Sequence, residues 1–182
     1  MSGSIAQMRN SVLALFLVGL ACTNASAEGR SAEAVPPALQ VRAELPLMAG
    51  VTDLKFRDFF TLPIGPRGLV PSARLLGLVG QRVRIVGYMA RQSEASPGIV
   101  IVAALPVVLG DEDESYADDL PASTLYVHLA AADRHHGVRW MSGLLGFTGV
   151  LQLGAMSETD GRTSFVRLQL DPELSHDLVA ER

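Results

Sequence analysis

The stretch that decides the fold is Arg82-Val83-Arg84-Ile85-Val86-Gly87-Tyr88-Met89. Successive side chains of a β-strand point to opposite faces, so alternation with a period of two predicts a strand here. One face holds Val83, Ile85, Gly87 and Met89, and the other holds Arg82, Arg84, Val86 and Tyr88. One apolar and one polar face is typical of an antiparallel strand that is buried on one side only.

Four further segments have strand patterns. Residues 99–105 are apolar on both faces, which predicts a central strand too short to cross a membrane. Residues 124–129 alternate again, with Leu125, Val127 and Leu129 on the inward face. The last two segments are 147–153 and 163–170, and the hairpin before residue 163 has Asp160-Gly161 in its turn.

These patterns predict a mainly β protein, a small five-stranded OB-like barrel with one or two short helices. A small open antiparallel sheet or a sandwich is the alternative. Ser72 is an expected N-cap for a short helix that Gly80 ends. Between the third and fourth strands we expect irregular structure, with a helical turn around Trp140.

The segment before this helix is rich in phenylalanine and proline. Phe56, Phe59 and Phe60 are expected to close one end of the core. Residues 63–71 contain three prolines and two glycines, which predicts a stiff loop and neither a helix nor a strand. A turn at a corner of the domain is the simpler interpretation of this loop, and a ligand-binding loop is the alternative.

Residues 78–89, the following turn and apolar strand, and Leu125-Tyr-Val-His-Leu129 together carry a family resemblance. The pattern of leucine, glycine, a basic residue, alternating valines, glycine and an aromatic residue resembles a group of uncharacterised bacterial exported proteins. The similarity covers about residues 75–170 and implies an OB-fold-like barrel and an envelope location, without an activity. Some of those proteins carry a cysteine and a proline-rich element after the second strand; this chain lacks both, so any site located there does not transfer.

The N-terminus has the three parts of a secretory signal: Arg9, the apolar run 11–21 and the cleavage pattern Ala25-x-Ala27. The run has about 11 residues, whereas a membrane-spanning helix needs roughly 20, so we expect a signal peptide over 1–27 and periplasmic localisation. A lipoprotein anchored through Cys22 is the alternative. After it, 28–50 is a predicted flexible lead-in, 51–175 a single barrel-like domain and 176–182 a tail.

Cleavage of the signal removes the only cysteine, and with it disulfides and thiol chemistry. It also removes Arg9, which leaves 14 basic against 19 acidic residues, a net charge of −5 with neutral histidines. An acidic chain without a basic run argues against nucleic-acid binding. We expect no cofactor and no transmembrane segment in the mature chain.

The acidic run Asp111–Glu114 with Asp118-Asp119 suggests calcium, which prefers clustered carboxylates. An EF-type loop that begins at Asp111 would need glycine at Tyr116 and glutamate at Ala122. A solvated acidic loop is therefore favoured, and no metal site is predicted.

The remaining chemistry-bearing residues are histidines and serines. His128, Asp133, His135 and His136 would serve a periplasmic hydrolase or metal-dependent enzyme if they converged on one pocket. Adjacent histidines point apart on a regular backbone, and no serine lies in a Gly-x-Ser-x-Gly elbow. No catalytic residue is therefore assigned, and the pattern favours a protein that is not an enzyme.

One group of outward-facing residues predicts binding. It comprises Arg82, Arg84 and Tyr88 from the first strand, with Tyr126 and His128 from the third. Guanidinium, phenol and imidazole groups suit an anionic or polar ligand or a partner protein, and OB-type barrels bind ligands on such a face. The hypothesis is an exported, non-catalytic binding or accessory protein of the bacterial envelope that works with an envelope protein or transport complex; a structural envelope subunit is the alternative.

Overall fold

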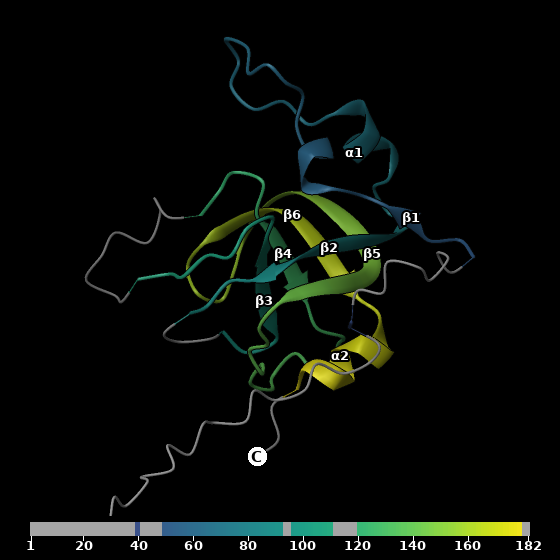
Figure 1. Ribbon diagram of the computed structural model, residues 1–182, viewed down its shortest axis with the longest axis vertical. Coiled ribbons are helices and arrows are strands. Elements are labelled where there is room, and N and C mark those ends of the chain that lie inside the picture. Colours follow the sequence, from purple (N-terminus) through teal and green to yellow (C-terminus); the bar gives the residue numbers. More distant parts are fainter. Residues whose placement is uncertain (1–38, 41–48, 93–95, 111–119, 180–182) are drawn as a thin grey trace, which may run out of the picture. The chain divides into compact units, whose positions relative to one another are not determined.

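The computed structural model describes residues 39–40, 49–92, 96–110 and 120–179, all within one unit of the chain. Figure 1 shows the strands and helices, which in chain order are β1 (Thr52–Asp53), the 3-10 helix η1 (Phe56–Asp58), α1 (Ala73–Gly77), β2 (Arg82–Met89), β3 (Ile99–Ala103), β4 (Leu125–His128), β5 (Leu144–Ser157), β6 (Thr163–Leu170) and α2 (Pro172–Leu178). The prediction of a mainly β protein with short helices is confirmed. Three elements were not predicted, namely β1, η1 and α2.

The six strands form one mixed sheet in the order β1-β2-β3-β4-β6-β5, and β2 also pairs with β5. Strands β2 to β6 therefore make a closed circuit of hydrogen-bonded neighbours. The β1–β2 and β4–β6 pairs are parallel and the others are antiparallel. The alternative of a small open antiparallel sheet is wrong, because two of the pairs are parallel and β2 to β6 form a closed circuit.

Strand β5 closes the circuit because it has two partners along its 14 residues. Its first half pairs with β2, from Leu144 opposite Tyr88 to Val150 opposite Arg82. From Gly149 onward it pairs with β6, with a register shift between Leu153 and Met156. A β-carbon at Gly149 would collide with the backbone of β6 at Gln169, so only glycine allows this approach.

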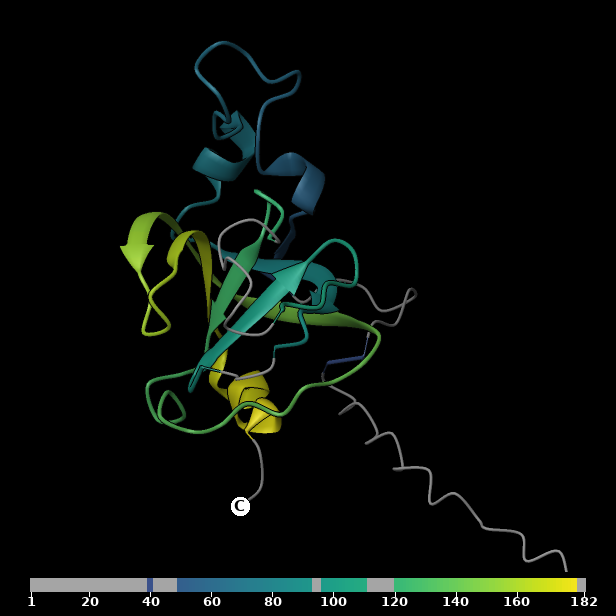
Figure 2. The same cartoon turned by 90° about the vertical axis from the view of Figure 1, so that its left-hand side faces the viewer.

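The main hydrophobic core lies on the inward faces of the strands, and residues outside the strands complete it. Helices η1 and α1 lie at one end of the sheet and α2 at the other (Figures 1 and 2). Phe56 and Phe59 are buried with ring centroids 5.2 Å apart, and Phe60 is partly buried against the same core, so the expected closure of one end by these aromatic residues is confirmed. Leu39 and Leu178 are 0% exposed, so the packed unit extends beyond the predicted range 51–175 at both ends.

A second apolar cluster lies on the outward side of β3 and β4. It contains Ala90, Ile99, Ile101, Leu109 and Tyr126, with Val107 and Leu120 packed against it. All five residues of β3 are buried, so the expected central strand with two apolar faces is confirmed. The segment after β3 covers this side of the sheet.

Two local predictions have different outcomes. The hydroxyl of Ser72 accepts a hydrogen bond from the N–H of Leu75 at 3.0 Å, which confirms the cap of α1. The helical turn around Trp140 is wrong, because residues 129–143 hold turns and no helix. Trp140 instead donates from Nε1 to the carbonyl of Met89 at 3.3 Å, and the Arg91 guanidinium lies over its ring.

Candidate functional site

The two arginines of the predicted patch each pair with a carboxylate from a neighbouring element. Arg82 donates from Nε to Asp171 at 2.9 Å, and Arg84 donates from Nε to Asp53 at 2.8 Å. The hydrogen bond with Asp171 raises the pKa of the Arg82 guanidinium, opposed by partial desolvation. These pairs fasten α2 and β1 to β2, which sequence alternation could not indicate.

Tyr126 does not lie on a solvent-exposed face as expected; it is 5% exposed within the second apolar cluster. Burial, with a smaller contribution from the charge of Asp160, raises the pKa of its phenol to about 12. Tyr88 is half-buried on the outward side of β2, and β3 separates that strand from β4. The structure therefore does not bring the five predicted residues into one patch.

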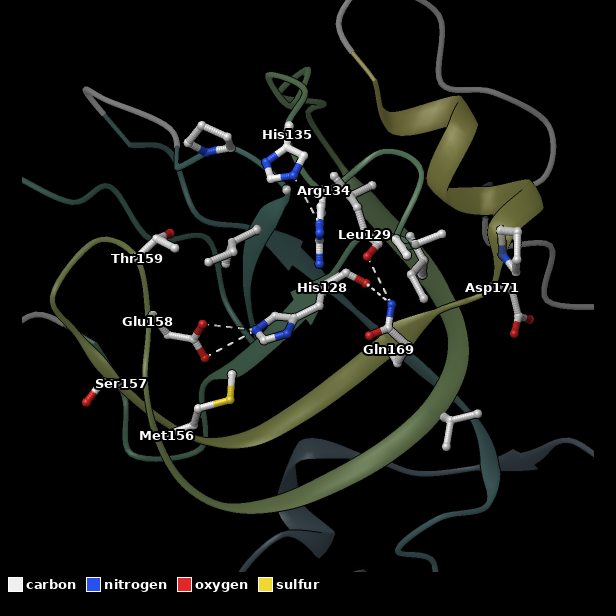
Figure 3. A pocket seen from close by; sticks show the side chains of 18 residues that line it. His128, Leu129, Arg134, His135, Met156, Ser157, Glu158, Thr159, Gln169 and Asp171 are labelled. Atoms are coloured by element: carbon white, nitrogen blue, oxygen red, sulfur yellow. Dashed lines mark hydrogen bonds and ion pairs between the residues drawn. The ribbon is translucent and has the colours of Figure 1, made fainter.

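His128, the fifth of these residues, lies in a cleft of about 790 Å³ at the end of β4. Three loops and the strand ends beside them enclose the cleft (Figure 3). These are the β2–β3 turn at Pro97-Gly98, the segment after β4 and the β5–β6 turn. The lining includes His128, Leu129, Arg134, His135, Met156 and Glu158.

The position of His128 is held by Glu158. Nε2 of His128 lies 3.1 Å from Oε2 of Glu158, and the side chain of Glu158 is only 2% exposed. The same carboxylate accepts a hydrogen bond from the hydroxyl of Ser164, and Arg167 donates to that hydroxyl at 3.3 Å. Because the carboxylate lies between the imidazole and the serine, His128 cannot act as the base of this serine; a triad has the imidazole in the middle.

The segment after β4 is fixed against the β2–β3 turn. Gly98 donates to the carbonyl of His136 at 3.0 Å, and Leu129 donates to the carbonyl of Gly98 at 2.9 Å. Gly98 has φ +70°, and a β-carbon there would overlap the backbone of Arg134. Only glycine permits this contact, so the Pro97-Gly98 turn forms a wall of the cleft.

Helix α2 holds the same segment from the other side. The buried hydroxyl of Ser175 accepts from the N–H of Ala130 at 2.8 Å and donates to Asp133 at 2.7 Å. Asp133 is therefore engaged in a structural contact. Hydrogen bonds therefore hold the chain on both sides of Arg134, and they fix the position of the backbone that carries its side chain.

Arg134 and His135 bring further basic groups to the cleft. Nε of Arg134 donates to Nε2 of His135 at 3.1 Å, so this imidazole nitrogen acts as an acceptor. Figure 3 shows the Arg134 guanidinium pointing into the space above His128. The cleft can therefore present one permanent cation and two imidazoles to a ligand, beside apolar walls from Leu129 and Met156.

The structure gives the metal-enzyme alternative no support. His128 and His135 share the cleft, whereas Asp133 binds Ser175. Among the residues that the structure describes, no three His, Cys, Asp or Glu side chains are grouped to hold a metal ion. The acidic run 111–119 lies outside the described residues.

Two cleft residues, Glu158 and Arg134, were missed by sequence reasoning. Arg134 directly precedes His135 and His136, and Glu158 precedes the predicted Asp160-Gly161 turn. Neither position has a pattern that marks it, because each comes to line the same cleft as His128 only in the folded chain. Comparison of the chain with protein-family models, with curated proteins and with solved structures found no match.

Proposed function

We propose that this chain is an exported, non-catalytic binding protein of the bacterial envelope, accessory to a transport or assembly complex. Its scaffold is a five-stranded OB-like barrel, and its cleft binds a small organic anion through a carboxylate or phosphate group. Export is inferred from the predicted signal over 1–27. The main support for this proposal is the position of the cleft, which lies over β3 and β4 between the β2–β3 and β5–β6 turns.

The pairing of the strands supports an OB-type barrel. Counted within the circuit, strands β2 to β6 are the first to the fifth strands. The pairing order β2-β3-β4-β6-β5-β2 then joins the first strand to the fourth and the third to the fifth, and the third and fifth are parallel. Barrels of this type bind ligands on the face of their second and third strands, between the loops that follow the first and fourth. The cleft is lined by Gly98 from the first of these loops, Ile99 and His128 from the strands, and Glu158 from the other loop.

The charges in the cleft favour an anion. Arg134 is exposed and points into it, and a guanidinium fork matches the geometry of a carboxylate or phosphate group. The two carboxylates that line the cleft are both paired, that of Glu158 with His128 and Ser164 and that of Asp171 with Arg82. The net charge of −4 for the whole chain disfavours a polynucleotide as the source of that phosphate.

The test is isothermal titration calorimetry of the full chain with succinate, citrate, inorganic phosphate and, as a neutral probe, maltotriose. We expect at least one anion to bind and Arg134→Gln to weaken its binding about tenfold or more, because a charge-assisted hydrogen bond is lost. Arg57→Gln is the matched control, since Arg57 is also an exposed arginine but lies outside the cleft.

The competing results are distinct. Binding of maltotriose alone would replace the anion with a neutral glycan. Equal loss of anion binding in Arg134→Gln and Arg57→Gln would mean that general charge, and not the cleft, attracts the anion. Either result contradicts the proposal.

A further inference from the structure

Residues 61–71, called the arm below, form a narrow loop that returns on itself. Phe60 and Pro71 bridge at its base, the N–H of Thr61 donates to the carbonyl of Val70 at 2.9 Å, and that of Gly68 donates to the carbonyl of Gly65 at 3.0 Å. Both views show the arm extending from the end of the sheet that carries η1 and α1 (Figures 1 and 2). Prolines and cross-loop hydrogen bonds make it stiff, so it presents its side chains at low entropic cost.

The arm exposes apolar side chains that are not part of the hydrophobic core. Every residue from Thr61 to Val70 is exposed. Leu62 is 68% exposed, Ile64 60%, and Leu69 and Val70 40% each. Four large apolar side chains on one protruding loop are a concentrated patch, and such patches mark interaction sites.

The segment that contains the arm differs in charge from the rest of the chain. Residues 54–81 hold four basic residues, Lys55, Arg57, Arg67 and Arg74, against one acidic residue, Asp58. This segment has a net charge of +3, so the remainder of a chain of net charge −4 has −7. Arg67 lies within the arm itself, and the side chain of Arg57 is 75% exposed.

We propose that the arm inserts its apolar side chains into the headgroup region of an anionic phospholipid membrane, with Arg67 and Arg57 on lipid phosphates. Apolar side chains beside basic ones are the composition of segments that bind membrane surfaces. Arg57 lines a shallow hollow together with Leu62 and Leu69 of the arm, so a cation lies beside the exposed apolar side chains, as binding to an anionic bilayer requires. This surface is separate from the cleft and does not depend on the anion proposed for it.

The test is vesicle flotation with the full chain carrying Cys22→Ser, so that no lipid anchor is attached at that residue. One set of vesicles contains equal parts phosphatidylglycerol and phosphatidylethanolamine, and the other contains phosphatidylcholine alone. We expect the chain to float with the anionic vesicles and release at high salt. The double variant Leu62→Ser/Ile64→Ser should reduce the bound fraction about tenfold, since it removes two large apolar contacts.

Val108→Ser/Leu144→Ser is the matched control, because both residues are exposed and apolar but lie outside the arm. It should float as the parent does. Arg67→Glu is a second variant that leaves the apolar side chains in place, and it should lower binding to anionic vesicles only.

Three results would overturn the proposal. One is no flotation of the parent with either vesicle. Another is flotation that both arm variants leave unchanged, which would assign membrane binding to another part of the chain. The third is self-association without flotation, lost in Leu62→Ser/Ile64→Ser, which would identify a second copy of the chain as the partner.

Discussion

The outward side of β2 and the outward side of β3 and β4 are built differently, although both belong to the same circuit of strands. On β2 the outward residues are half-buried, and its two arginines pair with Asp171 and Asp53. On β3 and β4 the outward residues Ile101 and Tyr126 are 1% and 5% exposed under the segment that follows β3. An outward position in a strand therefore does not determine whether a side chain meets water.

The difference also explains where the cleft lies. The second apolar cluster covers β4 as far as Tyr126, and His128, two residues later on the same face, is the first that the cleft reaches. The cleft opens where this cover ends. The three predictions below test this contrast between a covered and an open side of the sheet.

The largest effect is expected for Ile101→Ala on the covered side. Truncation of a buried isoleucine leaves a cavity and should lower the free energy of unfolding by about 3 kcal/mol. Arg84→Ala on the open side should lower it by less than about 1 kcal/mol. Urea denaturation measures both, and equal losses would show that the cover contributes no packing.

A smaller effect is expected from the phenol of Tyr126. Its pKa of about 12 in the folded chain exceeds the ordinary value of 10.0, so the folded state favours the neutral phenol. Stability from this group is full below pH 10.0 and decreases as the pH rises toward about 12. Between about pH 9 and about pH 11 the parent should lose about 1 kcal/mol more than Tyr126→Phe. Urea denaturation at the two pH values measures this, and identical losses would place the phenol in water.

The smallest effect is expected for the ion pair between Arg84 and Asp53. Their side chains are 29% and 41% exposed, so solvent screens the attraction. A double-mutant cycle with Arg84→Ala and Asp53→Ala should give a coupling energy below about 1 kcal/mol that falls further at high salt. A coupling several times larger and insensitive to salt would mean that the open side is as dry as the covered one.

Periodicity predicted much of the fold. The bounds of β2 and β6 agree with the predicted strands, since each has eight residues of regular sequence. β1 has two residues and α2 has seven, and neither is long enough for a repeating pattern. Packing holds them instead: Leu174 and Leu178 of α2 join the main core, and β1 pairs with β2.

The candidate site was predicted only in part. His128 was identified from its outward position on a strand, which is a local property. Glu158 and Arg134 line the same cleft from positions 30 and 6 residues away in the sequence, and no local pattern links them to His128. The five predicted binding residues were separated because β3 lies between β2 and β4 in the sheet.

The sequence by itself determined five of the six strands, because alternation of apolar and polar residues depends only on neighbours along the chain. It also determined the acidic balance and the stiff arm, which are properties of composition. Tertiary structure decided which outward faces are dry and where the cleft opens. These depend on which distant segment covers each strand, and that is set by how a closed circuit of strands satisfies its hydrogen bonds and packs its core.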